Sequence, residues 1–335
     1  MAFRFPSKSS QQVWAQETIT RALCLNRIKV TVGLCVKDCQ KTIGNSVDSI
    51  IEQDFPHECL ETIVVDGESK DQTVSLIKDR LSKTNIRLRV FSDRGEGLGM
   101  ARSIAVNQAS GEYIVWVDGD VTLPKGHIRE QVKFMEQNPR VGMARARWSL
   151  YTGTRLVPLL ESTRSLNFKI RDLKTKATSQ LLGTAGSTCR TKALRQVGNF
   201  DTHITGAGED IDIAVRIKAA GWIISVNQEV NHRFRETWKD LWNEYFWWGY
   251  GAHLVNHKHV GSISVWGRFP PVAFALGTFR LSGSYRATHS RAVLLLPLHR
   301  IFTGTAWLVG LVSSHADGYG HPDGSLLKSG QNLRR

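Results

Sequence analysis

The feature that most constrains the fold of this chain is a repeated alternation between residues 27 and 147. Short apolar runs of strand length alternate there with longer stretches whose apolar residues recur at helical spacing. The first such stretch, 42–53, places Ile43, Val47 and Ile50 on one helical face. Strands that alternate with helices form a parallel sheet with helices on both faces. We therefore expect an α/β domain with a doubly wound, mainly parallel, Rossmann-like sheet.

The expected strands and helices of this domain follow in regular order. The strands are expected at 28–36, 60–65, 86–91, 113–117 and 141–146, and the helices at 42–53, 71–81, 98–108 and 125–137. In doubly wound sheets, ligands bind outside the carboxyl ends of the strands. Acidic residues follow the first, second and fourth expected strands, at Asp38, Asp66 and Asp118. We expect a nucleotide site along this edge of the sheet.

The whole chain divides into four expected parts. Its 335 residues exceed the ~100–200 of a usual domain, so an appendage beside one large α/β domain is expected. The stretch from 151 to 230 is less regular and contains two glycine-rich loops. The expected parts are an N-terminal extension (1–26), the main α/β domain (27–230, with a nucleotide-binding half of about 27–150 and a second half of about 151–230), an aromatic, basic and apolar helical region (231–315), and a flexible tail (316–335).

The positive charge of the chain is concentrated toward its C-terminus. Of a net charge of +14, an excess of seven comes from residues 231–335, with twelve Lys/Arg against five Asp/Glu, and these residues include six of the ten Trp. Basic side chains mixed with Trp and aliphatic residues are typical of surfaces that meet anionic lipid headgroups. Nucleic acid also attracts cationic and aromatic side chains, but no known binding motif is present, and a solvated face needs no partner. We expect an anionic membrane surface as a partner and no nucleic acid.

Two apolar stretches in this region determine the expected mode of membrane attachment. Residues 269–279 are too few for a ~20-residue span, and residues 292–312 are interrupted by Pro297 and by polar residues. Four tryptophans between 238 and 248 lie among basic residues and are expected to contact the membrane. We therefore expect peripheral or C-terminally anchored attachment through interfacial or hairpin-like segments.

The cysteines and the N-terminus bear on the cellular compartment. The five cysteines are scattered and odd in number, without a C-x-x-C pair, which favours reduced thiols in a cytosolic setting. The first thirty residues lack the apolar core of a signal peptide. The expected location is therefore the cytoplasmic face of the cell membrane.

Two acidic motifs follow expected strands of the nucleotide-binding half. Asp66 ends the second strand, where its carboxylate can accept a hydrogen bond from a nucleobase N–H or a ribose hydroxyl. Asp71 is then expected to be the N-cap of the next helix. Asp118-Gly119-Asp120 follows the strand 113–117, and Mg²⁺ or Mn²⁺ is bound through one or two carboxylates plus the phosphates of a substrate. Taken alone, each motif is equally well explained by capping or by an acidic turn.

A third acidic motif begins the helix expected at 211–220. Gly206 and Gly208 permit close approach of the backbone to a substrate, and Glu209 and Asp210 lie at the helix start, where the helix dipole favours an ionised carboxylate. A carboxylate that faces a hydroxyl acceptor can act as the base in a direct displacement. Simple N-terminal capping is the alternative.

These segments together resemble the family-two, GT-A-fold inverting glycosyltransferases. The resemblance runs from Lys29 to about Gly251. It implies a GT-A fold, transfer of a sugar with inversion from a UDP-, GDP- or dTDP-sugar, Mn²⁺ or Mg²⁺ as the cofactor, and 151–230 as the acceptor half. The matching segments are Val64–Thr73, Arg94–Ala109 with Gly111–Asp120, Gly183–Arg190 followed by Gly198 and Phe200, and Gly206–Asp210.

The resemblance also implies roles for individual residues. Asp210 would be the catalytic base, and Glu209 would help to place the acceptor. Asp120 would bind the metal, with Asp118 and His232 as further metal contacts, although a lone His is often structural. Arg233 and Arg235 suit diphosphate oxygens because a guanidinium presents a fork of donors. The full expected donor site consists of Val36, Asp38, Asp66, Asp118, Arg190, Arg233 and Arg235.

Three other functions fit the residues less well. A nicotinamide dehydrogenase requires G-x-G-x-x-G directly after the first strand, whereas the nearest match, 95–100, follows a later strand and ends in Met100. A sugar-nucleotide pyrophosphorylase carries a basic, glycine-rich phosphate loop after the first strand, and 32–37 is not one. A non-catalytic membrane or nucleic-acid binding module on the same fold would be expected to lose part of the acidic set, which is complete here. The acceptor stays open between a glycan, a lipid-linked glycan and a polyprenyl phosphate.

Overall fold

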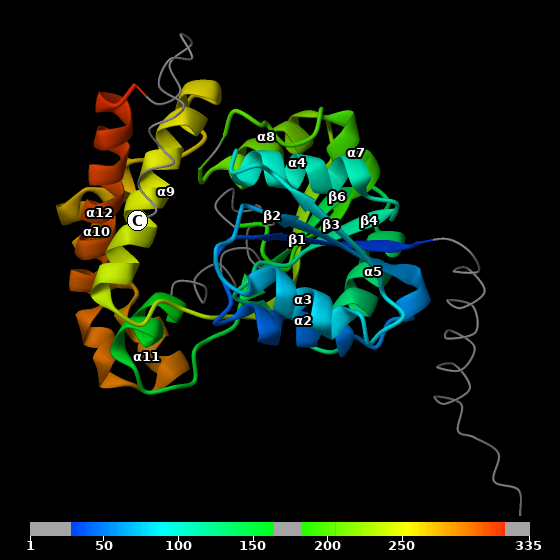
Figure 1. Cartoon of the computed structure of the whole chain (residues 1–335). Coiled ribbons are helices and arrows are strands. Elements are labelled where there is room, and N and C mark those ends of the chain that lie inside the picture. The colour runs from blue at the N-terminus through cyan, green and yellow to red at the C-terminus, as the bar shows by residue number, and fades with distance from the viewer. Residues whose placement is uncertain (1–27, 164–182, 205, 319–335) are drawn as a thin grey trace, which may run out of the picture.

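The computed structural model describes residues 28–163, 183–204 and 206–318, which are drawn in colour in Figure 1. The strands are β1 (Val30–Val36), β2 (Leu60–Asp66), β3 (Arg87–Ser92), β4 (Tyr113–Trp116), β5 (Val121–Thr122), β6 (Val141–Trp148), β7 (Thr188–Arg190) and β8 (Ile223–His232). They form one sheet in the order β3-β2-β1-β4-β7-β6-β8-β5. β7 and β5 are antiparallel to their neighbours, and the other pairs are parallel. The expected doubly wound, mainly parallel α/β sheet is confirmed.

Helices cover both faces of this sheet (Figure 1). On one face lie α2 (Ile43–Ile51), α3 (Thr73–Leu81) and α5 (His127–Gln137), and on the other lie α4 (Leu98–Gln108), α7 (Thr191–Gln196) and α8 (Glu209–Ala219). Successive strand residues enter opposite apolar layers, as the pleat requires. Val115 of β4 is buried in the same cluster as Ile43, whereas Trp116 is buried in the same cluster as Ala105. The apolar strand residues are thus buried between the sheet and its helices, and the polar residues that follow the strands lie at the edge of the sheet.

The nine strands and helices expected up to residue 148 are all present, with bounds within two residues of the expectation. The next expected helix, 211–220, begins two residues earlier, at Glu209. Asp71 is not the N-cap, because α3 begins at Thr73. Its Oδ1 instead accepts a hydrogen bond from the backbone N of Thr73 at 2.9 Å, just before the helix.

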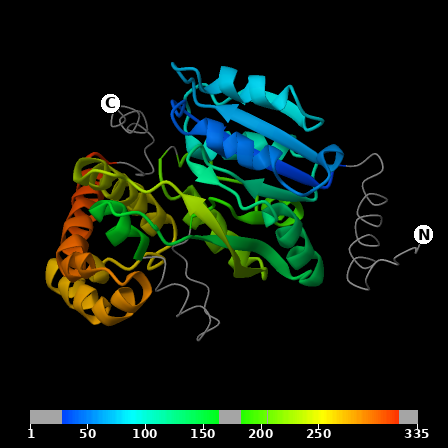
Figure 2. The same cartoon turned by 90° about the horizontal axis from the view of Figure 1, so that it is seen from below.

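The C-terminal region is helical and lies beside the sheet domain (Figure 2). It consists of α9 (Trp238–Lys258), α10 (Pro270–Phe279), α11 (Leu281–Thr288) and α12 (Leu296–Ala316), with short 3-10 turns η2 (Trp266–Arg268) and η3 (Arg291–Leu295). α9 and α12 run parallel and in contact (Figure 1). Glycines make this approach possible, because a Cβ at Gly249 would lie 1.9 Å from the carbonyl oxygen of Trp307.

The sheet domain and the helical region are joined by a buried carboxylate. Oδ1 of Asp212 in α8 lies 2.7 Å from Lys258 Nζ and 2.8 Å from His259 Nε2, both at the end of α9. Its other oxygen, Oδ2, pairs with Arg216 one turn along α8. Interactions with Arg216, Lys258 and His259 outweigh burial and lower the pKa of Asp212. The pairing keeps this charge in the protein interior and fixes the end of α9 on α8.

Several expectations about boundaries and cysteines change with the structure. β8 continues to His232, so the boundary expected at residue 230 falls inside a strand of the sheet. α12 reaches Ala316, and the rest of the expected tail beyond 318, like the expected extension 1–26, lies outside the described residues. Among the described cysteines, Cys35, Cys39 and Cys189 are free thiols and Cys59 is disulfide-bonded, so the expectation of reduced thiols is wrong for Cys59.

Candidate active site

The loops after β1 and β2 form one end of the candidate site. Val36 and Asp66, the last residues of these strands, are partners in the parallel register. The Asp66 carboxylate accepts hydrogen bonds from Ser69, at 2.6 Å from its Oγ and 3.1 Å from its N. Asp38 crosses between the two loops, because its Oδ1 accepts from the N of Lys70 at 2.7 Å and its N donates to Ser69 Oγ at 3.0 Å. The structure thus brings Val36, Asp38 and Asp66 together.

The Asp118-Gly119-Asp120 turn lies next to these loops. A Cβ at Gly119 would lie 2.7 Å from Cys39 Sγ, so a residue with a side chain would push the turn away from the loop after β1. Asp118 keeps 39% of its side chain exposed. Burial of its carboxylate raises the pKa of Asp118, Arg102 lowers it, and the Asp120 and Asp210 carboxylates add to the increase. The structure therefore places three of the predicted carboxylates within electrostatic reach of one another.

A buried arginine that the sequence analysis did not single out lies behind these carboxylates. Arg102 projects from α4, forms an ion pair with Glu209 at the start of α8, and lies 3.5 Å from Asp118 Oδ1. Its guanidinium also lies over the rings of Trp116 and Phe200, at 5.6 and 5.8 Å from their centroids. Burial raises the pKa of Glu209, while Arg102 acts against this increase. The pair is enclosed on all sides, since both side chains are less than 5% exposed.

This pair changes the expected role of Glu209. The carboxylate of Glu209 points into the protein toward Arg102, so it is not presented to an acceptor as the sequence analysis expected. It fixes the first turn of α8 to α4 instead. Any contribution of Glu209 to acceptor binding therefore acts through the position of its neighbour Asp210.

Asp210 occupies the first turn of α8 and is only partly buried. Gly208 precedes the helix with φ of 110°, a left-handed conformation that favours glycine. The Asp210 carboxylate accepts a hydrogen bond from the N of Ile211 at 2.8 Å, and a Cβ at Gly183 would lie 3.5 Å from its Oδ2. Among the residues that the structure describes, Asp210 forms no ion pair. A carboxylate of this kind is available to accept a proton.

His232 and Asp120 form the pair that best suits a metal ion. His232 Nε2 and Asp120 Oδ2 are 3.9 Å apart, too far for a hydrogen bond but close enough for two ligands of one ion. The ring of His232 stacks on Trp148 with centroids 4.0 Å apart. Burial lowers the pKa of His232, which favours the neutral imidazole that binds metals. The Nδ1 of His232 is buried without a hydrogen-bond partner among the described residues. The residues present therefore fit Mn²⁺ or Mg²⁺.

Three arginines were expected in the donor site, and the structure places two of them at the site and one away from it. Arg235 Nη1 lies 3.7 Å from Asp120 Oδ2, and the backbone N of Arg233 donates to the carbonyl oxygen of Asp120. Both are thus at the metal end of the site. Arg190 is not, because it pairs with Tyr113 at the amino end of β4, and its guanidinium donates to the carbonyl oxygen of Met135 at 3.0 Å. The expectation for Arg190 is corrected to a structural role.

The order of the strands and the helices on both faces of the sheet define a fold of GT-A type. Residues 31–198 match the family described as Glycosyl transferase family 2. The chain belongs to this family, and the resemblance drawn from the sequence is confirmed.

Solved structures and curated proteins provide points of comparison. The mannosyltransferase PcManGT from Pyrobaculum calidifontis, in complex with GDP-Man and Mn²⁺, shares the fold with a TM-score of 0.63 at 18% identity, over 91% of this chain and 94% of that chain. The poly(ribitol-phosphate) beta-N-acetylglucosaminyltransferase TarS of Staphylococcus aureus is 29% identical over 111 residues, which are 33% of this chain and 19% of that protein. The beta-monoglucosyldiacylglycerol synthase of Synechocystis sp. is 24% identical over 241 residues, 67% of this chain and 48% of that protein. The alignments thus cover less than half of either curated relative.

Proposed function

We propose that this chain transfers a sugar with inversion from a nucleoside-diphosphate sugar to a glycan or lipid-linked acceptor at a membrane surface, with Asp210 as the general base. The observation that carries the proposal is the contrast between two adjacent acids. Glu209 is buried against Arg102, whereas Asp210 is partly exposed and faces the loop that begins at Gly183. The fold thus holds one carboxylate as an anchor and leaves the next one available.

The reaction we propose is a single in-line displacement. Asp210 takes the proton of the acceptor hydroxyl as its oxygen bonds to the anomeric carbon, and the bond from that carbon to the diphosphate breaks. Asp38, Asp66 and Asp118 are the residues we assign to the nucleoside. Hydrogen bonds from Ser69 and Lys70 hold two of these carboxylates in place before the donor binds.

A metal ion is part of this proposal. Asp120 and His232 would hold it, with Asp118 nearby, and the ion supplies charge neutralisation to the departing diphosphate. Arg235 and Arg233 at the same end present cationic groups to the diphosphate oxygens. The Mn²⁺ and GDP-Man in the Pyrobaculum mannosyltransferase support this choice of cofactor and donor class.

The membrane part of the proposal rests on the surface of the C-terminal helices. Apart from Ile223, every exposed large hydrophobic side chain in the described ranges lies between residues 238 and 312. The most exposed include Phe279 (86%), Trp266 (73%) and Leu294 (65%). Residues 245–316 contain six Lys/Arg and no Asp or Glu. Exposed apolar side chains among unopposed basic ones suit an anionic membrane surface.

The residues that carry this surface differ from those expected. Trp242 packs on Phe302, and Trp248 packs on Tyr245, so these tryptophans complete the helical bundle. Most of the exposed side chains come from η2, α10, α11, η3 and α12 instead, and of the expected tryptophans Trp238 is 39% exposed. The segment Arg291–Ala316 is long and apolar enough to cross a bilayer, but 44% of its apolar window is buried in the protein, and core helices pass the same test. We therefore propose peripheral attachment to a membrane surface.

A donor screen tests the enzymatic proposal. The purified chain is incubated with Mn²⁺ or Mg²⁺ and with UDP-, GDP- and dTDP-sugars, with membrane lipid extract as the acceptor source, and release of nucleoside diphosphate is measured with and without EDTA. We expect release from one donor class, lost with EDTA and with Asp120→Ala. The matched control is Asp79→Ala, which removes an exposed acid of α3 that pairs with Lys83, and its turnover should be unaffected. If no donor is turned over and calorimetry detects no nucleotide binding, the chain is the non-catalytic module instead.

A vesicle assay tests the membrane surface separately. The double variant Phe279→Ser/Leu294→Ser should sediment less than the native chain with vesicles that contain anionic lipid. Ile223→Ser removes an exposed apolar side chain of β8, outside the helical region, and should bind as the native chain does. Equal sedimentation of all three proteins would contradict the assignment.

A further inference from the structure

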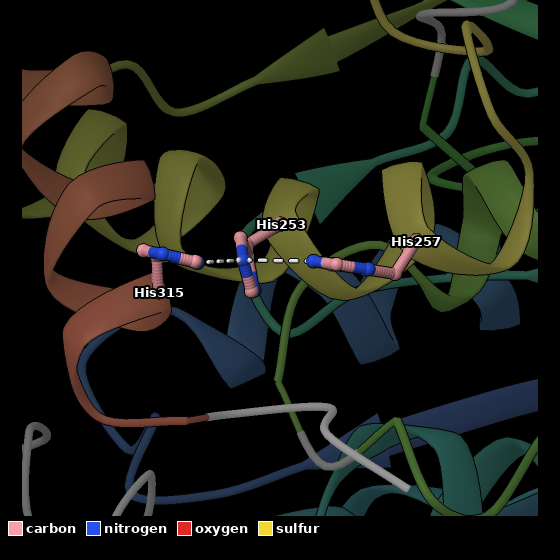
Figure 3. A group of neighbouring side chains, drawn as sticks. All are labelled: His253, His257 and His315. Atoms are coloured by element: carbon pink, nitrogen blue, oxygen red, sulfur yellow. Dashed lines mark hydrogen bonds between the residues drawn. The ribbon is translucent and has the colours of Figure 1, made fainter.

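Three histidines come together where α9 and α12 end (Figure 3). His253 and His257 lie one turn apart on α9, and His315 lies in the last turn of α12. His253 Nε2 lies 3.1 Å from His257 Nε2 and 3.1 Å from His315 Nδ1. One ligand nitrogen from each ring is within 4.8 Å of the other two. Three ring nitrogens therefore lie close together, with His253 Nε2 in contact with the other two.

Hydrogen bonding alone accounts poorly for this arrangement. An imidazole nitrogen presents either one proton or one lone pair in the plane of its ring. His253 Nε2 therefore cannot donate to one neighbouring ring and accept from the other at the same time. A cation at the centre would use a lone pair of all three nitrogens together. Zn–N bonds of about 2.0–2.1 Å in a tetrahedral site place ligand nitrogens about 3.3 Å apart, close to the two contacts observed.

The surroundings of the cluster also favour a cation. α9 and α12 run parallel and end near each other, so the negative ends of two helix dipoles lie beside the histidines. His253 is buried, whereas His257 and His315 are exposed. A metal ion could therefore reach the cluster from solvent, and water could complete its coordination.

We propose that His253, His257 and His315 form a binding site for Zn²⁺ or a similar divalent transition metal, separate from the Asp120 and His232 pair. Two ligands at positions i and i+4 of one helix with a third from a neighbouring helix are a sufficient set for such an ion. The ion joins the end of α12 to α9. It leaves one coordination position for water.

The position of this site on α9 gives it a consequence for the active site. Gly251, on the other side of α9 from the histidines, touches the loop before α8, since a Cβ there would lie 1.9 Å from the carbonyl oxygen of Ala207. Gly208, the residue before Glu209, is in contact with Val255 of the same helix. A metal that fixes α9 against α12 therefore also fixes the support of the loop that carries Asp210.

Cobalt binding is the test. The full chain, stripped with EDTA and dialysed, is titrated with Co²⁺, because four-coordinate Co²⁺ absorbs visible light far more strongly than the six-coordinate ion expected at a carboxylate-rich site. We expect about one equivalent of the strong band, displaced by Zn²⁺ and lost in His257→Gln and His315→Gln. Asp120→Ala should keep the band, which separates this site from the active site. His289→Asn is the matched control, because His289 is exposed, lies outside the cluster, and has a φ of 51° that Asn tolerates.

Thermal unfolding gives a second measurement on the same proteins. Zn²⁺ should raise the midpoint of the native chain and of His289→Asn, and it should not change that of His257→Gln or His315→Gln. Circular dichroism before titration shows whether each variant is folded. If His257→Gln does not fold, His315→Gln carries the test, because His315 is exposed in the last turn of α12. Absence of the strong band from the native chain, or an equal band in folded His257→Gln and His315→Gln, would overturn the proposal.

Discussion

Replacement of Arg102 by Met should reveal the buried ion pair behind the active site. Met fills much of the space between Trp116 and Phe200 but leaves the Glu209 carboxylate, 3% exposed, without its cation. Breaking a buried pair by removing one partner costs about 3–5 kcal/mol. Glu209 can limit this cost by binding a proton. With an ordinary Glu pKa of about 4.3, protonation costs about 4 kcal/mol at pH 7 and about 1 kcal/mol at pH 5.

The pH dependence of this loss follows from the direction of the pKa shift. Burial without Arg102 raises the pKa of Glu209 in the folded state further above its unfolded value. In the native chain the pKa of Glu209 is already raised to about 7, so the variant loses stability relative to the native chain only as the pH rises through that value. We expect the charge-dependent part of the loss in Arg102→Met to be near zero at pH 5 and to reach about 3 kcal/mol at pH 9.

Urea unfolding at the two pH values measures this effect. Arg102→Met/Glu209→Gln should recover most of the pH 9 loss, because the uncompensated charge is removed. Arg129→Met, which breaks an exposed pair with Asp54, is the matched control and should lose less than about 1 kcal/mol. A loss for Arg102→Met that is the same at both pH values, or that the double variant does not reduce, would refute the reasoning.

Three further predictions concern the base, a buried histidine and the loop support. If the acceptor is a hydroxyl, Asp210→Asn should reduce turnover by a factor of about 10²–10⁴ and retain donor binding. A mild defect would indicate an acceptor phosphate that is already ionised. Loss of donor binding, measured by calorimetry, would contradict the assignment of Asp210 as the base. Burial lowers the pKa of His127 to about 4. The unfolded state therefore binds the proton first, and the free energy of unfolding of the native chain should fall by about 3 kcal/mol as the pH falls from 6.5 to 4. His127→Gln should remove this component from the pH profile of urea unfolding, and an unchanged profile would be inconsistent with a buried neutral imidazole. Gly251→Ala should lower both the unfolding midpoint and turnover, since its Cβ would lie 1.9 Å from the carbonyl oxygen of Ala207. Gly283→Ala is the control and should lower neither, because a Cβ there would have no atom within 4 Å. Equal behaviour of the two variants would show that the close contact is unimportant.

The alternation in the sequence was enough to predict the sheet, its helices and the edge that carries the acids. This worked because strand and helix periods are local properties of the chain, and because parallel strands bring their carboxyl ends to one edge whatever the details of packing. Asp38, Asp66 and Asp118 could therefore be assigned to one site before their contacts were known. The family motifs added Asp210 and Asp120 to the same prediction.

Only the tertiary structure decided which of these side chains face the site. Arg190 follows a glycine-rich loop in sequence, but β7 runs antiparallel to β4 and carries Arg190 to the opposite edge. Arg102 and Glu209 are 107 positions apart, and His253 and His315 are 62 apart. No local pattern records such contacts, because they depend on how separate elements pack. The sequence thus determined the elements and the site edge, and the packing of α4 on α8 and of α9 on α12 determined the buried pair and the histidine cluster.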